Sequence, residues 1–121
     1  MLGDVHTDLL AKLADVSALR AKVHAANIAN QNTPGYKAQA VDFDERFQQA
    51  LAGGDTDAAD DLQPTVVAAE GGPEQADGNN VAVDREVLEQ AQNNTLYNAY
   101  LGVLQGRKKL LTIAITSAPG G

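Results

Sequence analysis

The sequence predicts a mainly α-helical fold, in which two long terminal helices form an antiparallel coiled coil around an irregular, partly β middle segment. Apolar residues recur at helical spacing near both ends, whereas glycine, proline and aspartate are concentrated between them. We expect three parts: an N-terminal coiled-coil helix in residues 1–32, a turn, short helix and flexible acidic segment in 33–83, and a C-terminal helix and tail in 84–121 that packs with the first helix.

A heptad seam defines the helix expected over residues 5–30. One apolar set recurs every seven positions and a second set lies three positions further on, giving Leu2, Leu9, Val16 and Val23, then Val5, Leu19 and Ala26. Lys12 interrupts the seam at one inner position. So narrow a seam favours packing against another helix over burial in a broad core.

A rigid turn is expected where this helix stops. Pro34 disfavours a helical conformation for the residue before it, and Gly35 supplies the positive φ of a type II turn. Asparagine side chains compete for backbone hydrogen bonds, so Asn27, Asn30 and Asn32 suit the fraying end of a helix. A simple turn needs only the Pro-Gly pair, and we therefore expect these asparagines to bond something specific, such as a neighbouring chain.

The middle segment carries weaker signals. We expect extended chain through residue 42 and then a short helix, because Phe43, Phe47 and Leu51 recur every four positions before a Gly-Gly pair. Residues 53–80 should be the least regular part, since their composition offers little apolar surface to bury. Turn residues there are compatible with a hairpin that pairs residues 65–68 with 81–83.

A second long helix is expected from Asp84, a good N-cap, to about residue 116. Two adjacent rows of large side chains give it a wider apolar face than the first helix: Tyr97, Leu101, Leu104, Leu111 and Ile115 in one row, and Leu96, Tyr100, Val103 and Leu110 in the other. The basic run 107–109 suits the negative end of the helix dipole. The terminal helices should pair with each other and with further copies of themselves.

Composition narrows the classes of protein further. With 121 residues, two Phe, three Tyr and no Trp, the chain is one domain whose solitary core would be marginal. It has no cysteine, no membrane-length apolar run and no start typical of a cleaved signal peptide, which predicts either a cytoplasmic protein or export by another route. Thirteen of the 16 acidic residues lie in 42–89, and this distribution argues against nucleic-acid binding.

No candidate catalytic, cofactor or metal site emerges. His6 and His24 are too far apart for a metal pair on one helix, and the aspartates of 55–61 lack the glycine and closing glutamate of a calcium loop. Asp42, Asp44 and Glu45 show no sign of a closed pocket that would shift their pKa values. We therefore expect a non-enzyme without cofactors. The alternatives are a free coiled-coil adaptor or export chaperone of a secretion system and, more remotely, a wall-lytic enzyme.

Two sequence blocks resemble a known family. The first comprises Asn27, Ile28, Asn30, Thr33, Pro34, Gly35, Tyr36 and Lys37, and the second is the run 79–86. Both resemble the bacterial flagellar basal-body rod family, most of all its short proximal FlgB group, with the short FlgC group as the nearest alternative. The resemblance covers residues 16–50 and 78–115, and departs from the family pattern at Gln31-Asn32 and in the tail.

This resemblance implies a structural protein that polymerises helically into the periplasmic rod of the flagellar basal body, the drive shaft for motility. In that family the terminal helices form an inner tube of coiled coils around the export channel, and the first block above is the assembly motif. The implied partners are further copies, FlgC-like, FlgF-like and FlgG-like rod subunits, FliE and the MS ring. Export would use the flagellar type III apparatus, without a cleaved signal peptide. On this view an isolated subunit is partly unfolded and becomes helical on assembly.

Overall fold

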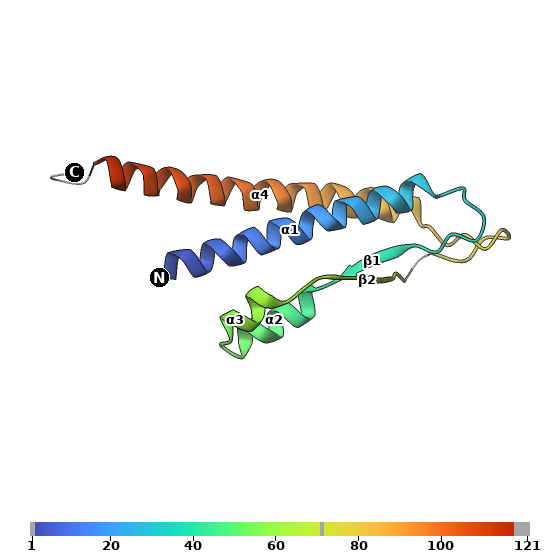
Figure 1. Cartoon of the computed structure of the whole chain (residues 1–121). Helices are drawn as coiled ribbons and strands as arrows, with labels where there is room; N and C mark the ends of the chain where they lie inside the picture. Colours follow the sequence, from blue (N-terminus) through green and yellow to red (C-terminus); the bar gives the residue numbers. More distant parts are fainter. Residues whose placement is uncertain (1, 71, 118–121) are drawn as a thin grey trace.

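The computed structural model describes residues 2–70 and 72–117 and confirms the mainly helical fold with two long terminal helices. The elements, in chain order, are α1 (Leu2–Ala29), β1 (Gln39–Asp42), α2 (Asp44–Ala52), α3 (Thr56–Asp61), β2 (Thr65–Ala68) and α4 (Val83–Thr116). Figure 1 shows α1 and α4 side by side and antiparallel, with the first turn of α1 and the last turn of α4 at the same end. No helix in the described part of the chain combines the length and apolarity needed to cross a membrane.

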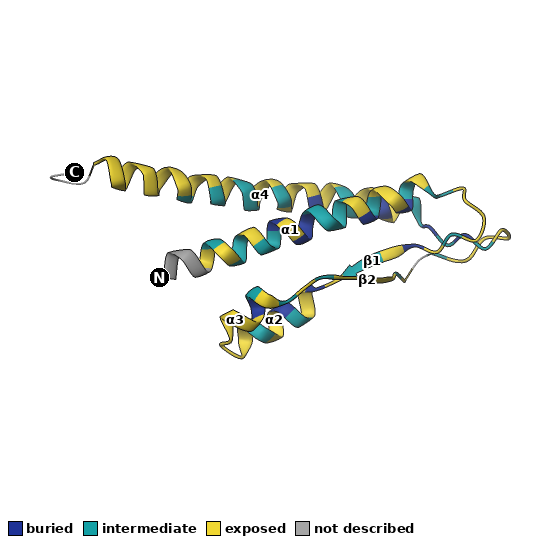
Figure 2. Cartoon of the chain, in the orientation of Figure 1, coloured by how far each residue is buried: buried dark blue, intermediate teal, exposed yellow. Residues whose placement is uncertain are grey.

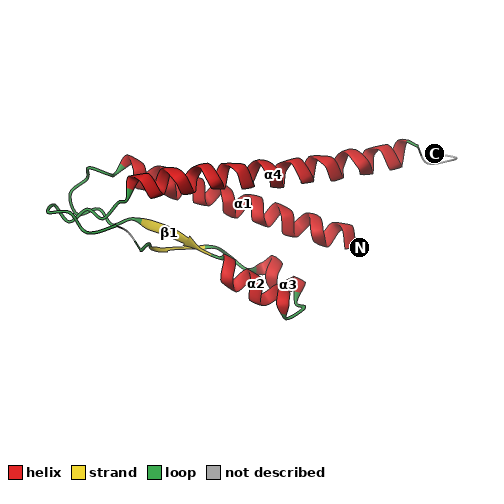
Figure 3. Cartoon of the chain, turned by 180° about the vertical axis from the view of Figure 1, so that it is seen from behind, coloured by secondary structure: helices red, strands yellow, loops and turns green. Residues whose placement is uncertain are grey.

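The two long helices lie close together at one end and diverge toward the other (Figures 1 and 3). Near the closed end α1 turns small or polar side chains such as Ser17 toward α4, and hydrogen bonds join the two helices there. Toward the open end, the C-terminal half of α4 is largely exposed (Figure 2). The helix pair is therefore complete over only part of its length.

A short two-stranded sheet leads to two short helices beside α1, and we call these helices, α2 and α3, the arm. β1 and β2 pair antiparallel, with Gln39 opposite Ala68 and Asp42 opposite Thr65. The ladder continues past the strands, because the Ala69 N–H donates to the Ala38 carbonyl. Residues 53–80 thus contain regular structure, and Asp55 stabilises the start of α3 by accepting a hydrogen bond from the Ala58 N–H at 2.9 Å.

The expected pairing of residues 65–68 with 81–83 is wrong, because β2 takes β1 as its partner. The segment after residue 79 runs along residues 36–38 instead, where the Asn80 N–H donates to the Tyr36 carbonyl and the Asn80 side chain accepts from the Ala38 N–H. Asn80 therefore bonds the chain just before β1. The N-cap prediction is also wrong by two positions: Ala82 is the N-cap and makes no side-chain cap bond, and Asp84 lies in the first turn of α4.

The hydrophobic core lies between α1 and the arm. Val16, Phe43, Phe47 and Ala59 are buried together, and the two phenylalanine rings stack with centroids 4.9 Å apart. Partly buried side chains surround this group: Leu9, Leu13, Val41, Ala50 and Leu62. The core is small, as the scarcity of aromatic residues leads one to expect, and it uses Val16 of the predicted seam to hold the arm.

Candidate functional site

The predicted turn lies at the closed end of the molecule, in a compact unit that we call the corner, formed by residues 27–38 and 74–82. The Tyr36 N–H donates to the Thr33 carbonyl at 3.2 Å, which closes a four-residue turn. Gly35 has φ +74°, which confirms the expected positive φ. Its N–H donates to the Asp77 carbonyl at 2.8 Å and so links the turn to the second segment of the corner.

Asn27 is a buried side chain of the corner that forms three hydrogen bonds. It is fully buried, and its amide forms two hydrogen bonds with the backbone of Gln39: Nδ2 donates to the carbonyl at 2.8 Å and Oδ1 accepts from the N–H at 3.0 Å. The Tyr36 hydroxyl donates to the same Oδ1 at 3.1 Å. The Asn27 amide thus bonds both backbone groups of Gln39, the first residue of β1, as the backbone of a neighbouring strand would.

Asn79, also fully buried, closes the end of α1 from across the corner. Its Nδ2 donates to the carbonyls of Asn30 and Thr33, both at 2.8 Å. These two carbonyls also accept the backbone N–H groups of Thr33 and Tyr36, so the Asn79 amide adds a second bond to each and ties the end of α1 to the other segment of the corner. The Asn30 amide donates back to the Ala26 carbonyl and accepts from the Thr33 hydroxyl.

Lys37 joins the two segments of the corner on their exposed side. Its Nζ donates to the Gly78 carbonyl and forms an ion pair with Glu74 at 2.9 Å. Gly78 has φ +85°, and a Cβ there would lie 3.3 Å from the Gly35 Cα. Two glycines in the left-handed region therefore let the two segments of the corner approach closely.

These contacts change the interpretation of the motif. We expected the asparagines to bond a neighbouring chain, but the amides of Asn27 and Asn30 form hydrogen bonds within their own chain. Ile28 is half-buried, and Thr33, Pro34, Gly35 and Lys37 are exposed. Any assembly contact of the motif falls to these exposed residues, while its asparagines build the corner.

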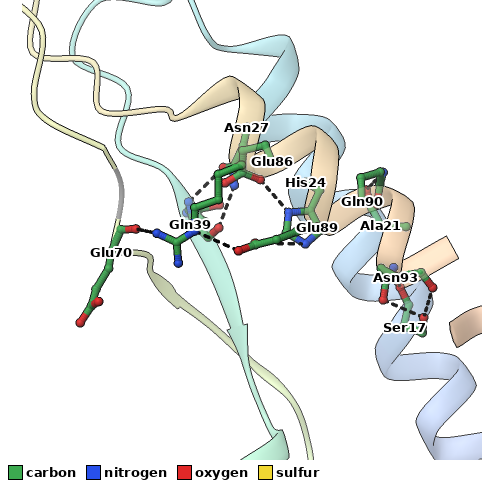
Figure 4. A network of polar contacts seen from close by, with 11 residues as sticks. Ser17, Ala21, His24, Asn27, Gln39, Glu70, Glu86, Glu89, Gln90 and Asn93 are labelled. Atoms are coloured by element: carbon green, nitrogen blue, oxygen red, sulfur yellow. Dashed lines mark hydrogen bonds and ion pairs between the residues drawn. The ribbon is translucent and has the colours of Figure 1, made fainter. Parts of the chain in front are cut away.

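A polar ladder joins α1 to α4 below the corner (Figure 4). It has three rungs: Ser17 with Asn93, Ala21 with Gln90, and His24 with Glu86. In the first, the Ser17 hydroxyl donates to Asn93 Oδ1 and Asn93 Nδ2 donates to the Ser17 carbonyl, both at 2.8 Å. Sequence patterns missed this ladder, because nothing in the local sequence indicates that residues 76 positions apart are bonded.

The third rung pairs an imidazole with a carboxylate. His24 Nδ1 lies 2.6 Å from Glu86 Oε2, and the His24 side chain is 12% exposed and that of Glu86 8%. Arg85 extends the network by bonding the Glu70 carbonyl and Glu89, and the hydrogen bond to Glu89 raises the pKa of the Arg85 guanidinium above its ordinary value. The network ties the middle segment to both long helices.

The predicted helix seams are not equally covered. Val16 and Val23 are buried, while Leu9, Leu19, Tyr97, Leu101 and Leu104 are half-buried. By contrast, Leu111 is 63% exposed and Ile115 67%. The seam of α4 therefore continues beyond the part that its own chain covers.

Two of the groups typical of catalysis or metal binding have structural roles. His24 bonds Glu86, and Asp55 caps α3. Within residues 2–70 and 72–117, no three His, Cys, Asp or Glu side chains converge as they would around a metal ion.

Comparison with known proteins adds a family to this geometry. The model of the family "Flagella basal body rod protein" matches residues 17–37, the second half of α1 and the turn. The flagellar basal body rod protein FlgB of Escherichia coli is 33% identical over 113 residues, which cover 78% of this chain and 81% of that protein. FlgB of Bacillus subtilis is 33% identical over 81% of this chain and 83% of its own length, and FlgB of Borrelia hermsii 27% over 93% and 96%.

Both sequence blocks that resembled the rod family meet in the corner, and the similarity to FlgB proteins spans most of the chain. The chain belongs to the FlgB family of flagellar basal body rod proteins.

Proposed function

We propose that this protein is a structural subunit of the proximal flagellar rod, which polymerises helically with its terminal helices around the export channel. Its partners are further copies of the chain, rod subunits of the FlgC, FlgF and FlgG types, FliE and the MS ring. It reaches the periplasmic rod through the flagellar type III apparatus without a cleaved signal peptide. It performs no catalysis.

The exposed C-terminal half of α4 is the observation that carries this proposal. Large apolar side chains lie around most of that half: Val103, Leu110, Leu111, Ile113 and Ile115 are between 47% and 69% exposed. A helix with large apolar side chains exposed on several faces is ordinarily covered by neighbouring elements. Its own α1 diverges from it, so further helices must supply the cover, as they would in a tube of packed subunits.

The open end of the helix pair is shaped to receive such neighbours. A cleft of about 360 Å³ separates the start of α1 from α4 and is lined by Thr7, Leu104, Arg107, Lys108 and Leu111. By contrast, the corner and the polar ladder are bonded internally. We infer that the closed end sets the angle between the helices and that the open end is completed on assembly.

The experiment is complementation in the source bacterium. Deleting the gene should abolish motility, and an epitope-tagged copy should restore it and copurify with isolated basal bodies. Full motility of the deletion strain, or a tagged chain found only as a free dimer by light scattering, would contradict the proposal. The dimer would favour the adaptor or chaperone alternative.

A second measurement addresses folding. Circular dichroism of the isolated chain should show less helix than the 28 residues of α1 and 34 of α4 require, because the uncovered half of α4 lacks packing partners. A monomer that carried the full helix content and melted in one cooperative transition would count against assembly-coupled ordering.

A further inference from the structure

The exposed half of α4 is basic as well as apolar. Lys108 and Lys109 are exposed there, among the large apolar side chains, and no acidic residue occurs in positions 90–121. We call this surface, from Val103 to Ile115, the α4 tail. Two α4 tails placed together would bring like charges into contact, which is unfavourable. A partner for this surface must therefore be apolar and acidic.

A surface of that kind lies on the other side of α1. An apolar groove of about 280 Å³ runs between α1 and α2, and Arg107 of α4 is one of its lining residues; the others are His6, Leu9, Leu10, Leu13, Phe47 and Leu51. Beside it, Asp8, Asp57 and Asp60 converge with Thr56 in a hollow between α1 and α3. Within the described part of the chain, none of these three carboxylates forms an ion pair.

We propose that the α4 tail of one copy docks on the α1–arm surface of a second copy. Apolar side chains of the tail enter the groove, and Lys108 and Lys109 face the carboxylates of Asp57 and Asp60. The inference rests on the proposed function and names one of its contacts. Arg107 of the tail lines the groove of its own chain, but α1 lies between α4 and the arm in Figure 1, and Ile115 remains 67% exposed. The apolar end of the tail therefore does not fill the groove of its own chain.

Such a contact joins two different patches and is therefore heterologous. Each copy that offers its tail to one neighbour still presents its own arm to another. Repeated contacts of this type form a ring or an open helical array, whereas a two-fold contact between identical patches stops at a dimer. The pairing of tail with arm would thus let copies add one after another in a single direction.

The chain holds no cysteine, so cysteine cross-linking tests the contact cleanly. Cells co-express two tagged forms, one with Leu51→Cys and the other with Ile115→Cys, so that any disulfide between the tags joins two copies. Basal bodies isolated after mild oxidation should contain the cross-linked pair. The matched control replaces Leu51→Cys by Leu88→Cys, which is also exposed but lies in the first half of α4. It should give about tenfold less product, because a disulfide needs Cα atoms within about 7 Å.

Charge reversal provides a second, independent test of the contact. The double variants Lys108→Glu/Lys109→Glu and Asp57→Lys/Asp60→Lys should each lower incorporation into basal bodies about tenfold, and the two sets combined in one chain should restore it. The control Asp15→Lys/Lys22→Glu, on exposed positions of α1, should leave incorporation unchanged. Circular dichroism of each purified variant verifies that its helix content matches that of the parent.

The outcomes separate this contact from the proposed function. Basal bodies that contain the chain but show no excess of the 51–115 product over the control overturn the docking and leave the rod function standing. The same holds for absent charge rescue, or for a tail that cross-links to a different rod protein. A chain missing from basal bodies overturns both.

Discussion

The corner and the α4 tail differ in how far their own chain covers them. In the corner, two fully buried asparagines bond backbone groups at the end of α1 and the start of β1. In the α4 tail, Leu110 and Leu111 remain exposed. The comparison teaches that the most distinctive motif of a subunit can serve its internal geometry while its assembly surface is a plain apolar helix.

If this distinction is correct, substitutions in the two regions should fail differently. Corner variants should lose stability first and assembly as a consequence. Tail variants should keep their stability and lose assembly alone. The predictions below run from the largest expected loss of stability to the smallest.

Replacing Asn27 by alanine should have the largest effect. The change leaves the N–H and carbonyl of Gln39 and the hydroxyl of Tyr36 without their partner in a partly buried place, at a cost of about 2–4 kcal/mol. Native-state amide hydrogen exchange should show protection of the Gln39 N–H falling at least about a hundredfold. Asn32→Ala, on an exposed asparagine of the same motif, is the control and should change nothing. Equal protection in both variants would show that the corner does not depend on Asn27.

Gly35→Val should come next, with a loss of about 2–3 kcal/mol, because a β-branched residue adopts φ near +74° only under strain. A Cβ at this position meets no atom within 4 Å, so the cost is purely conformational. Urea titration followed by circular dichroism measures this loss of stability. Motility in a swarm assay, which depends on assembly, should fall more than the soluble fraction of the expressed protein. Gly35→Asn should retain most of the stability, since asparagine tolerates this region. Normal motility of the valine variant would refute a requirement for the rigid turn.

The sequence alone could predict what is local in this molecule. The turn followed from Pro34, which restricts the backbone, and Gly35, which permits a positive φ. The ends of α1 and α4 followed from spacing to within one helical turn. Pairings over long distances could not be predicted. Thr65–Ala68 carries no signal that distinguishes β1 from residues 81–83 as its partner, because both are short and partly apolar. In the fold, Asn80 bonds residues 36 and 38, and β2 pairs with β1.

The site divides in the same way. Proline and glycine revealed the shape of the turn, but the partner of each asparagine depended on the fold. We assigned the amides to a neighbouring chain because a single sequence does not show that Asn79 returns to the end of α1, 49 positions away.

Asn93→Ala should have a moderate effect, about 1–2 kcal/mol, because it removes the side chain that bonds both the hydroxyl and the carbonyl of Ser17. Exchange protection should fall in α4 around residue 93 while the corner keeps its own. The neighbouring Asn94→Ala is a matched control on an exposed position. If protection in the corner fell equally, the ladder and the corner would be one cooperative unit, and the proposed division of roles would need revision.

Leu111→Gln should have the smallest effect on stability and the most informative one on assembly. The side chain is 63% exposed, so its replacement should change the free energy of unfolding by no more than about 0.5 kcal/mol. Incorporation into basal bodies should nevertheless fall, because a polar side chain would then be buried where neighbouring subunits cover the helix. The control Leu88→Gln, at 59% exposure on the first half of α4, tests whether replacing any exposed leucine lowers incorporation. An unchanged rod in the Leu111 variant would mean that this face of the tail stays in solvent after assembly, and the contrast with the corner would lose its basis.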